Sequence, residues 1–209
     1  MVVGEKPMLI DPQTTRGADL YQYMVRLIGP RPIAWISTRS VEGVSNLAPY
    51  SFFNGVTSRP PSLVFSSVCK PDGGLKDSLT NIVATGEFVV NVVPYSLAES
   101  MVATSRDWEA EIDEFEMCGI EATPSALVAP LRVARSPAAF ECRLMQVVEV
   151  GSGPGAASLV IGEIVAIAID DSVLGADNFP DPAALDLIGR MGGNTYARTT
   201  DRFDLERPS

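Results

Sequence analysis

The stretch RPIAWISTRSVEGVSNLAPYS, residues 31–51, decides the fold of this chain. Two extended runs, residues 32–38 and 44–51, flank a short polar link that contains Gly43, which is typical of a β-hairpin. Both runs mix apolar residues with hydroxyl, amide and guanidinium groups, which a plain core hairpin does not need. We therefore expect this hairpin to form one wall of a small-molecule site, and we expect the ligand to carry a phosphate.

The charge of the chain is unevenly distributed. The formal net charge is −10, which argues against nucleic-acid binding and against attraction to an anionic membrane. Residues 31–76, however, contain five basic residues, Arg31, Arg39, Arg59, Lys70 and Lys76, against only two acids, Glu42 and Asp72. A local balance of five minus two, +3, favours a discrete anionic ligand, although chance clustering of surface cations is the simpler alternative.

The composition is that of a soluble globular protein. Of the 209 residues 46% are apolar and 20% are charged, and no repeat or linker divides the chain, so we predict a single domain over residues 1–209. The longest apolar run, residues 158–169, is too short to cross a bilayer and contains Glu163. No signal-peptide pattern is visible at the start, and we expect a cytoplasmic protein.

Cysteine and histidine usage narrows the chemistry. Cys69, Cys118 and Cys142 show no CxxC spacing, which fits a reducing compartment and indicates neither a zinc nor an iron–sulfur site. Cys142 lies in an apolar run and is expected in the core. The chain contains no histidine, which excludes a Ser-His-Asp triad and imidazole acid–base catalysis. If this protein is an enzyme, we expect a cofactor to bring the reactivity.

The rest of the pattern predicts a β-rich domain of six or seven strands with a few short helices, closed into a barrel that hides its strand edges. We expect residues 1–17 to form an arm. The predicted helices are 19–27 (with Leu20, Tyr23 and Leu27 on one face), 76–84, 96–104 (begun by a Ser96–Glu99 capping box) and 185–190. The other predicted strands are 62–68, 87–93 and the antiparallel pair 138–150 and 158–169, while residues 52–55 extend the hairpin. The acidic segment 108–116 reads as solvated, or else as a flexible lid.

Lys76, Asp77 and Ser78 give the best local signal for a phosphate. They stand at a predicted helix start, where free N–H groups and the positive end of the helix dipole favour an anion. The aromatic residues Trp35, Tyr50, Phe52 and Phe53 offer a surface for a flat ring, but at alternating positions aromatic side chains more often fill a core. Neither GxGxxG nor GxxxxGK[ST] occurs, so a Rossmann site and a P-loop are not supported.

Eight motifs in order make the chain resemble a known family. They are GPRPIAWIST (29–38), NLAPYSFF (46–53), KDSLTNI (76–82), EFVVNVV (87–93), DEFEMCGI (113–120), SPAAFECRL (136–144), LVIGEIV (159–165) and IGRMGGNTYAR (188–198). The chain resembles the flavin reductase-like FMN-binding split-barrel family, which includes flavoredoxins and the reductase components of two-component flavin monooxygenases. The resemblance implies an antiparallel split β-barrel, a homodimer and non-covalent FMN near the dimer interface, with the C-terminal segment 185–209 close to that interface.

The resemblance also implies which residues bind the cofactor. By position, the segments beside the flavin ring and ribityl chain supply Trp35, Thr38, Asn46, Leu47, Ala48, Ser51, Ser66 and Ser67. The segment near the phosphate supplies Lys76, Asp77 and Ser78, with Arg31 as a further candidate, and Arg190 and Tyr196 come from a C-terminal segment close to the site. Some relatives place a histidine near the flavin, and this chain has none.

The expected activity is reduction of flavin by NADH or NADPH, with hydride passing to the flavin N5, so that no catalytic side chain is required. Two alternatives stay open: an FMN electron carrier of the flavoredoxin kind, and a flavin-free binding module. The expected partners are a second copy of the chain, flavin and nicotinamide, with an oxygenase or redox protein as a further candidate.

Overall fold

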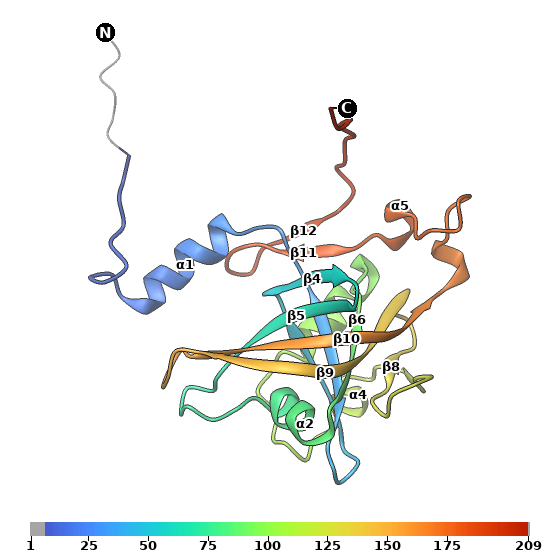
Figure 1. The fold of residues 1–209 in the computed structure, drawn as a ribbon, viewed down its shortest axis with the longest axis horizontal. Coiled ribbons are helices and arrows are strands. Elements are labelled where there is room, and N and C mark those ends of the chain that lie inside the picture. The colour runs from blue at the N-terminus through green and yellow to red at the C-terminus, as the bar shows by residue number, and fades with distance from the viewer. Residues whose placement is uncertain (1–6, 209) are drawn as a thin grey trace.

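A seven-stranded antiparallel sheet dominates the computed structural model, which describes residues 7–208 (Figure 1). Its strand order is β3 (Ser45–Tyr50), β2 (Ala34–Arg39), β6 (Glu87–Asn91), β9 (Ala138–Val150), β10 (Ala157–Ile169), β5 (Pro61–Val68), β4 (Phe53–Ser58). A three-stranded sheet holds β1 (Arg31–Pro32), β11 (Ile188–Arg190) and β12 (Tyr196–Arg198), and a two-stranded sheet holds β7 (Ala122–Thr123) and β8 (Arg132–Val133).

The short helices lie between the strands. They are α1 (Gly17–Leu27), α2 (Asp77–Thr85), α3 (Ala98–Ala103), α4 (Glu114–Met117) and α5 (Pro182–Leu185), with 3-10 turns η1 (Tyr95–Leu97) and η2 (Asp171–Val173). The predicted helix at residues 76–84 is confirmed as α2, and Gly86 ends it with the left-handed backbone (φ 75°) that glycine adopts most easily. Among the described residues, no helix combines the length and the apolar character needed to cross a bilayer.

The predicted hairpin is confirmed. β2 pairs with β3 in a continuous register from Ala34↔Tyr50 to Arg39↔Ser45, and Gly43 takes a positive φ of 91° in the connecting turn. Because β2 also pairs with β6, it is an inner strand, and its first five residues are all buried. Successive side chains of a strand point to opposite faces, so β2 contributes to two separate parts of the core.

The two edges of the curled sheet come together where β3 is joined to β4, although these strands do not pair with each other within residues 7–208. These strands form the two opposite edges of the seven-stranded sheet, yet only Ser51 and Phe52 separate them in the chain. The sheet must therefore curl until its edges meet, and Ser66 on β5 donates its N–H to the carbonyl of Phe52 at 2.8 Å. The prediction that residues 52–55 extend the hairpin is wrong, because the chain turns at Ser51 and β4 pairs with β5 instead.

Two hydrophobic clusters fill the core. The first contains Ile36, Phe65, Ile82 and Phe88, together with Cys142, whose predicted burial is confirmed. The second lies on the other face of β2 and contains Ile33, Trp35, Leu47, Val93, Leu97, Met101, Phe115, Val133 and Ile188. The aromatic residues of the hairpin accordingly act mainly as core residues, because Trp35 is fully buried and Tyr50 and Phe53 pack against the first cluster.

Two of three predicted local features differ in the structure. Residues 188–190 form strand β11 rather than a helix, because β1 provides an antiparallel partner for them. The predicted helix at residues 19–27 is confirmed as α1, which buries Val25 and leaves Leu27 82% exposed; Figure 1 shows α1 standing away from the sheets. No Ser96–Glu99 capping box forms, because the chain enters α3 through the 3-10 turn η1.

Gly162 on β10 provides a test of the first cluster. A Cβ at this position would lie 2.3 Å from Cζ of the fully buried Phe88, so Gly162→Ala forces the aromatic ring to move. We expect this substitution to lower the free energy of unfolding by about 1–3 kcal/mol in urea denaturation. Gly55→Ala on the exposed strand β4, where a Cβ meets nothing within 4 Å, is the matched control. Equal unfolding midpoints for the two variants would contradict the packing described here.

Candidate functional site

Two adjoining cavities lie along the hairpin. The α2 cavity, of about 470 Å³, extends from the hairpin to the start of α2, and the α1 cavity, of about 400 Å³, extends from the hairpin to α1 and β11. Pro49, Tyr50 and Ser105 line both cavities, so the two volumes meet at the end of β3. Each volume is in the range of small-molecule sites in proteins.

The predicted site residues divide into three groups. The α2 cavity is lined by Asn46, Ala48, Lys76, Asp77 and Ser78. The α1 cavity is lined by Arg31, Ser51, Arg190 and Tyr196. Neither cavity is lined by Trp35, Thr38, Leu47, Ser66 or Ser67. The side chains of Trp35 and Leu47 lie in the second core cluster, and Ser67 faces a smaller third cavity, of about 170 Å³.

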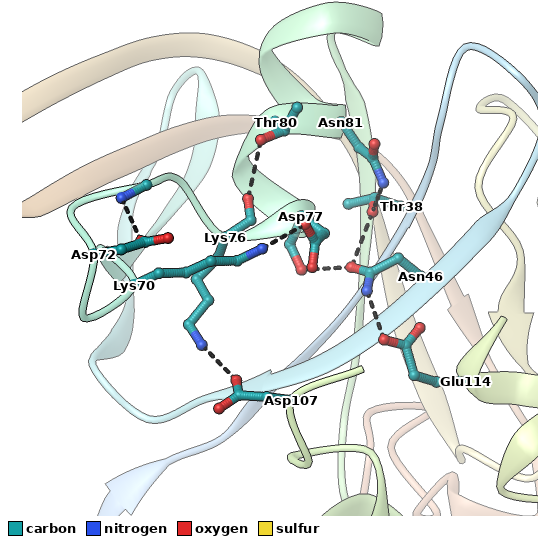
Figure 2. A network of polar contacts seen from close by, with 12 residues as sticks. Thr38, Asn46, Lys70, Asp72, Lys76, Asp77, Thr80, Asn81, Asp107 and Glu114 are labelled. Atoms are coloured by element: carbon teal, nitrogen blue, oxygen red, sulfur yellow. Dashed lines mark hydrogen bonds and ion pairs between the residues drawn. The ribbon is translucent and has the colours of Figure 1, made fainter. Parts of the chain in front are cut away.

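The start of α2 offers free N–H groups to the α2 cavity. Lys76 is the N-cap residue, with an extended backbone (φ −71°, ψ 148°), and within the described part of the chain no side chain caps this end of the helix. An uncapped helix start attracts anions. The Lys76 ammonium lies 2.9 Å from the carboxylate of Asp107, whose side chain is 87% exposed (Figure 2). An exposed ion pair of this kind is weak and is easily exchanged for a ligand.

The charges are distributed differently from the sequence prediction. Of the five basic residues in segment 31–76, Lys70 and Lys76 line the α2 cavity and Arg31 lines the α1 cavity, while Arg39 and Arg59 are exposed elsewhere. Five acidic residues also line the α2 cavity, namely Asp72, Asp77, Asp107, Glu109 and Glu114, and Lys70 pairs with Asp77 at 2.9 Å. Arg106 is a third basic residue of this cavity, so three basic residues face five acidic ones, and the α2 cavity has an excess of acidic side chains. Arg31 and Arg190 line the α1 cavity, and none of the described residues around it is acidic.

A buried polar network connects the hairpin to α2 and α4 (Figure 2). Glu114 is 5% exposed and accepts hydrogen bonds from Asn46 Nδ2 and from the Leu47 N–H, each at 2.9 Å. Asn46 Oδ1 accepts from Ser78 at 2.6 Å and from Thr38 at 3.3 Å. Burial raises the pKa of Glu114, and the N–H groups of Leu47 and Asn46 oppose that shift.

The acidic segment 108–116 is not simply solvated, because Trp108 and Glu114 both line the α2 cavity. Asp113 caps α4, accepting the N–H groups of Phe115 and Glu116, and this turn directs Glu114 inward. The Nε1–H of Trp108 is buried and has no hydrogen-bond partner among residues 7–208, although a guanidinium, that of Arg106, lies 4.6 Å from the ring centroid. The sequence signal that could have pointed to Glu114 is Asp113, a helix-capping residue type that stands directly before Glu114 and Phe115.

Arg31 organises the α1 cavity. Its guanidinium is buried and donates to the carbonyls of Val25 (2.6 Å) and Ile28 (2.5 Å), at the C-terminal end of α1, and of Met191 (2.9 Å) beyond β11. A fourth contact, from Nε to Ser51 Oγ, is longer at 3.4 Å. Arg31 thus joins α1, the hairpin and the C-terminal segment.

A second arginine lines the same cavity from β11. Arg190 donates a hydrogen bond to the Tyr196 hydroxyl, and its guanidinium lies 4.6 Å from the centroid of that ring. It also donates to the carbonyl of Gly193 at 2.5 Å. These contacts hold the Arg190 side chain against β12 at the wall of the cavity.

Comparison with known proteins identifies the family. The family model of the flavin reductase like domain matches residues 26–189. These residues include the hairpin that lines both cavities, helix α2 and the network around Glu114. The chain belongs to the flavin reductase-like family. This membership, and the antiparallel barrel that goes with it, confirm the resemblance and the fold predicted from the sequence, and they place the chain among flavin-related oxidoreductases.

The individual relatives cover nearly the whole chain. An uncharacterized protein of Deinococcus radiodurans is 40% identical over 94% of this chain and 86% of its own length. Among solved structures, nitrilotriacetate monooxygenase component B of Bacillus cereus superposes with a TM-score of 0.91 at 28% identity, over 96% of this chain and 100% of that one. The 2-nitrobenzoate 2-nitroreductase of Pseudomonas fluorescens has a TM-score of 0.85 at 33% identity, with 97% of each chain covered.

The residues around the α2 cavity fit a phosphorylated polyol attached to a flat ring, as a flavin mononucleotide is. The helix start and Lys76 suit the phosphate, and the hydroxyls of Ser78, Thr104 and Ser105 suit the polyol. The unpartnered indole N–H of Trp108 is a donor that a ligand oxygen would satisfy.

The Arg31 contacts yield a stability prediction. The planar guanidinium of Arg31 donates to three carbonyl groups at once, which a lysine ammonium cannot do. Arg31→Lys should therefore lower the free energy of unfolding, measured by chemical denaturation, by about 1–3 kcal/mol. Arg39→Lys is the control, because Arg39 is exposed and its one side-chain hydrogen bond within residues 7–208 goes to the Gly43 carbonyl at 3.1 Å. A loss of similar size in both variants would show that Arg31 does not join these segments.

Proposed function

We propose that this protein binds FMN and catalyses reduction of flavin by NADH or NADPH. The observation that carries the proposal is the meeting of two cavities at Pro49 and Tyr50, one of which ends at an uncapped helix start and the other between two arginines. A flavin and its reductant need two neighbouring binding volumes that share one wall. The family match supports this assignment, and the similarity to a monooxygenase component and to a nitroreductase supports a redox function.

The FMN phosphate is assigned to the start of α2. The N–H groups of the first helical turn and the Lys76 ammonium lie on one side of the cavity, and Asp107 is exposed enough to give up its contact with Lys76. In this assignment Asp77 does not contact the phosphate, because Lys70 holds its carboxylate. The ring end then lies toward Pro49, Tyr50 and Ser51.

The α1 cavity is assigned to the nicotinamide donor. Arg31 and Arg190 line it without an acidic neighbour among the described residues, which suits the pyrophosphate of NADH or NADPH. When bound, FMN supplies the ring that accepts hydride at N5. The protein's part is to hold the two ligands and exclude water, so a chain without histidine is adequate for this activity.

Two features bear on partners. The similarity to nitrilotriacetate monooxygenase component B supports an oxygenase as the consumer of reduced flavin. Helix α1 and the residue after it expose Tyr21, Met24, Leu27 and Ile28 to between 49% and 82%, which supports the proposed homodimer through this helix. The alternative activity is an electron carrier, in which the bound flavin exchanges electrons with a redox protein and not with nicotinamide.

The visible spectrum of FMN-loaded protein tests the reductase. Anaerobic addition of NADH or NADPH should remove the visible flavin absorbance, and the faster donor is the physiological type. Excess free FMN should then sustain steady nicotinamide oxidation. Flavin that stays oxidised with both donors would contradict the reductase and favour the electron carrier. Protein that binds no flavin would contradict both.

Lys76→Ala tests the phosphate assignment. Loss of a charged donor to a phosphate should weaken FMN binding about tenfold, while riboflavin, which has no phosphate, should bind as before. Quenching of flavin fluorescence measures both affinities. Arg59→Ala removes an equal charge from an exposed position that lines neither cavity, and it should leave both affinities unchanged. Equal weakening of FMN and riboflavin would place the phosphate elsewhere.

A further inference from the structure

With Glu114 ionised, the polar network around Asn46 has one consistent arrangement of hydrogen atoms. An ionised carboxylate only accepts hydrogen bonds, and the two groups that approach Glu114, Asn46 Nδ2 and the Leu47 N–H, only donate. This contact fixes which end of the Asn46 amide faces Glu114. The carbonyl oxygen Oδ1 must then face the hydroxyls of Ser78 and Thr38.

Each of those hydroxyls must therefore give its single hydrogen to Asn46. Thr38 Oγ1 also accepts a hydrogen bond from Asn81 Nδ2 at 3.0 Å, so it is satisfied inside the network. Ser78 Oγ donates to Asn46 as its one hydrogen bond within residues 7–208, and Ser78 belongs to the wall of the α2 cavity. What Ser78 offers a ligand is thus a lone pair, and its hydrogen is already committed.

Tyr50 lines the same cavity as Ser78, but no hydrogen bond joins the Tyr50 hydroxyl to Ser78 within residues 7–208. The lone pairs of Ser78 that face the cavity therefore stay available to a ligand.

We infer that Glu114 is a positioning residue that acts through Asn46 to make Ser78 a hydrogen-bond acceptor, so that Ser78 binds a ribityl hydroxyl of the flavin and not its phosphate. The inference rests on the proposed flavin site. A phosphate ester is close to a dianion at neutral pH and has no hydrogen to give, so its oxygens would meet the Ser78 lone pairs unfavourably. A ribityl O–H has a hydrogen to donate. This changes the sequence-based assignment of Ser78, whereas Lys76 keeps its phosphate role.

Comparison of FMN with riboflavin tests the role of Ser78. Both ligands carry the ribityl chain, so Ser78→Ala should weaken the binding of both by the same factor, about fivefold. Quenching of flavin fluorescence measures the two affinities. Weakening of FMN alone would overturn the inference. Thr85→Ala is the control: it removes a hydroxyl from the exposed end of the same helix, outside the cavity, and should change neither affinity.

An exchange of the two side-chain types tests the role of Glu114. Glu114→Gln places two amides face to face, and Asn46→Asp places two carboxylates face to face. Each single substitution should weaken the binding of both FMN and riboflavin about tenfold. The reason is that a charge-assisted hydrogen bond is lost and Ser78 is no longer oriented.

The double variant Asn46→Asp/Glu114→Gln restores a consistent network with the charge on the other side. The amide introduced at position 114 can accept from the Leu47 N–H and donate to the carboxylate introduced at position 46. That carboxylate then still accepts from Ser78, as Asn46 does in the wild type. Binding of both flavins should return to within about twofold of wild type.

The possible outcomes separate the two claims. The inference is overturned, while the flavin site stands, by either of two results. One is a wild-type flavin affinity in Glu114→Gln, and the other is a double variant that binds flavin no more tightly than the single variants. Thermal unfolding of each variant shows whether it is folded, and if Glu114→Gln does not fold, the Ser78→Ala comparison decides alone. If the wild-type protein binds neither flavin, the proposed function and this inference both fail.

Discussion

The outer edge of β3 imposes the constraint on which the site depends. As an edge strand of the seven-stranded sheet, β3 pairs with β2 alone among the strands of residues 7–208 and leaves outward N–H groups to be satisfied. At Leu47 the partner is the carboxylate of Glu114. The same carboxylate holds the amide of Asn46, so one buried charge completes the strand edge and orients the cavity wall. Removing the carboxylate would take away the hydrogen-bond acceptor of both the Leu47 N–H and the Asn46 amide.

The contrast between the two cavities follows from how each holds its basic residues. In the α2 cavity, Lys70 and Lys76 are neutralised by acids on the same wall, so an anionic ligand must replace an existing partner. In the α1 cavity, Arg31 is satisfied by carbonyl groups, which accept its hydrogens without cancelling its charge. A positive potential therefore persists there. Reversible binding of a cofactor suits the first arrangement, and attraction of a changing anionic substrate suits the second.

The long strands were predictable from the sequence, because β9 and β10 are long apolar runs separated by a Gly-rich link, and β2 is an extended run that ends before a polar, Gly-containing turn. The same reasoning failed where pairing depends on distant segments. Nothing local distinguishes residues 52–55 as the start of a new strand at the opposite edge, and β11 is a strand only because β1 lies beside it. The motif resemblance named several segments that line the two cavities. It did not reveal Glu114, because an acid among five acids reads as solvated until the turn of α4 directs it inward.

Because the chain contains no histidine, the orientation of Ser78 depends on a carboxylate and an amide and not on an imidazole. Imidazole exchanges donor and acceptor roles near neutral pH, because its ordinary pKa is about 6.5. The Glu114 carboxylate accepts two N–H groups, which favour its charged form, while burial raises its pKa. The amide it orients cannot titrate at all. As long as Glu114 is ionised, the direction of the hydrogen bonds that reach Ser78 is fixed, and the wall of the α2 cavity presents one pattern of donors and acceptors to its ligand.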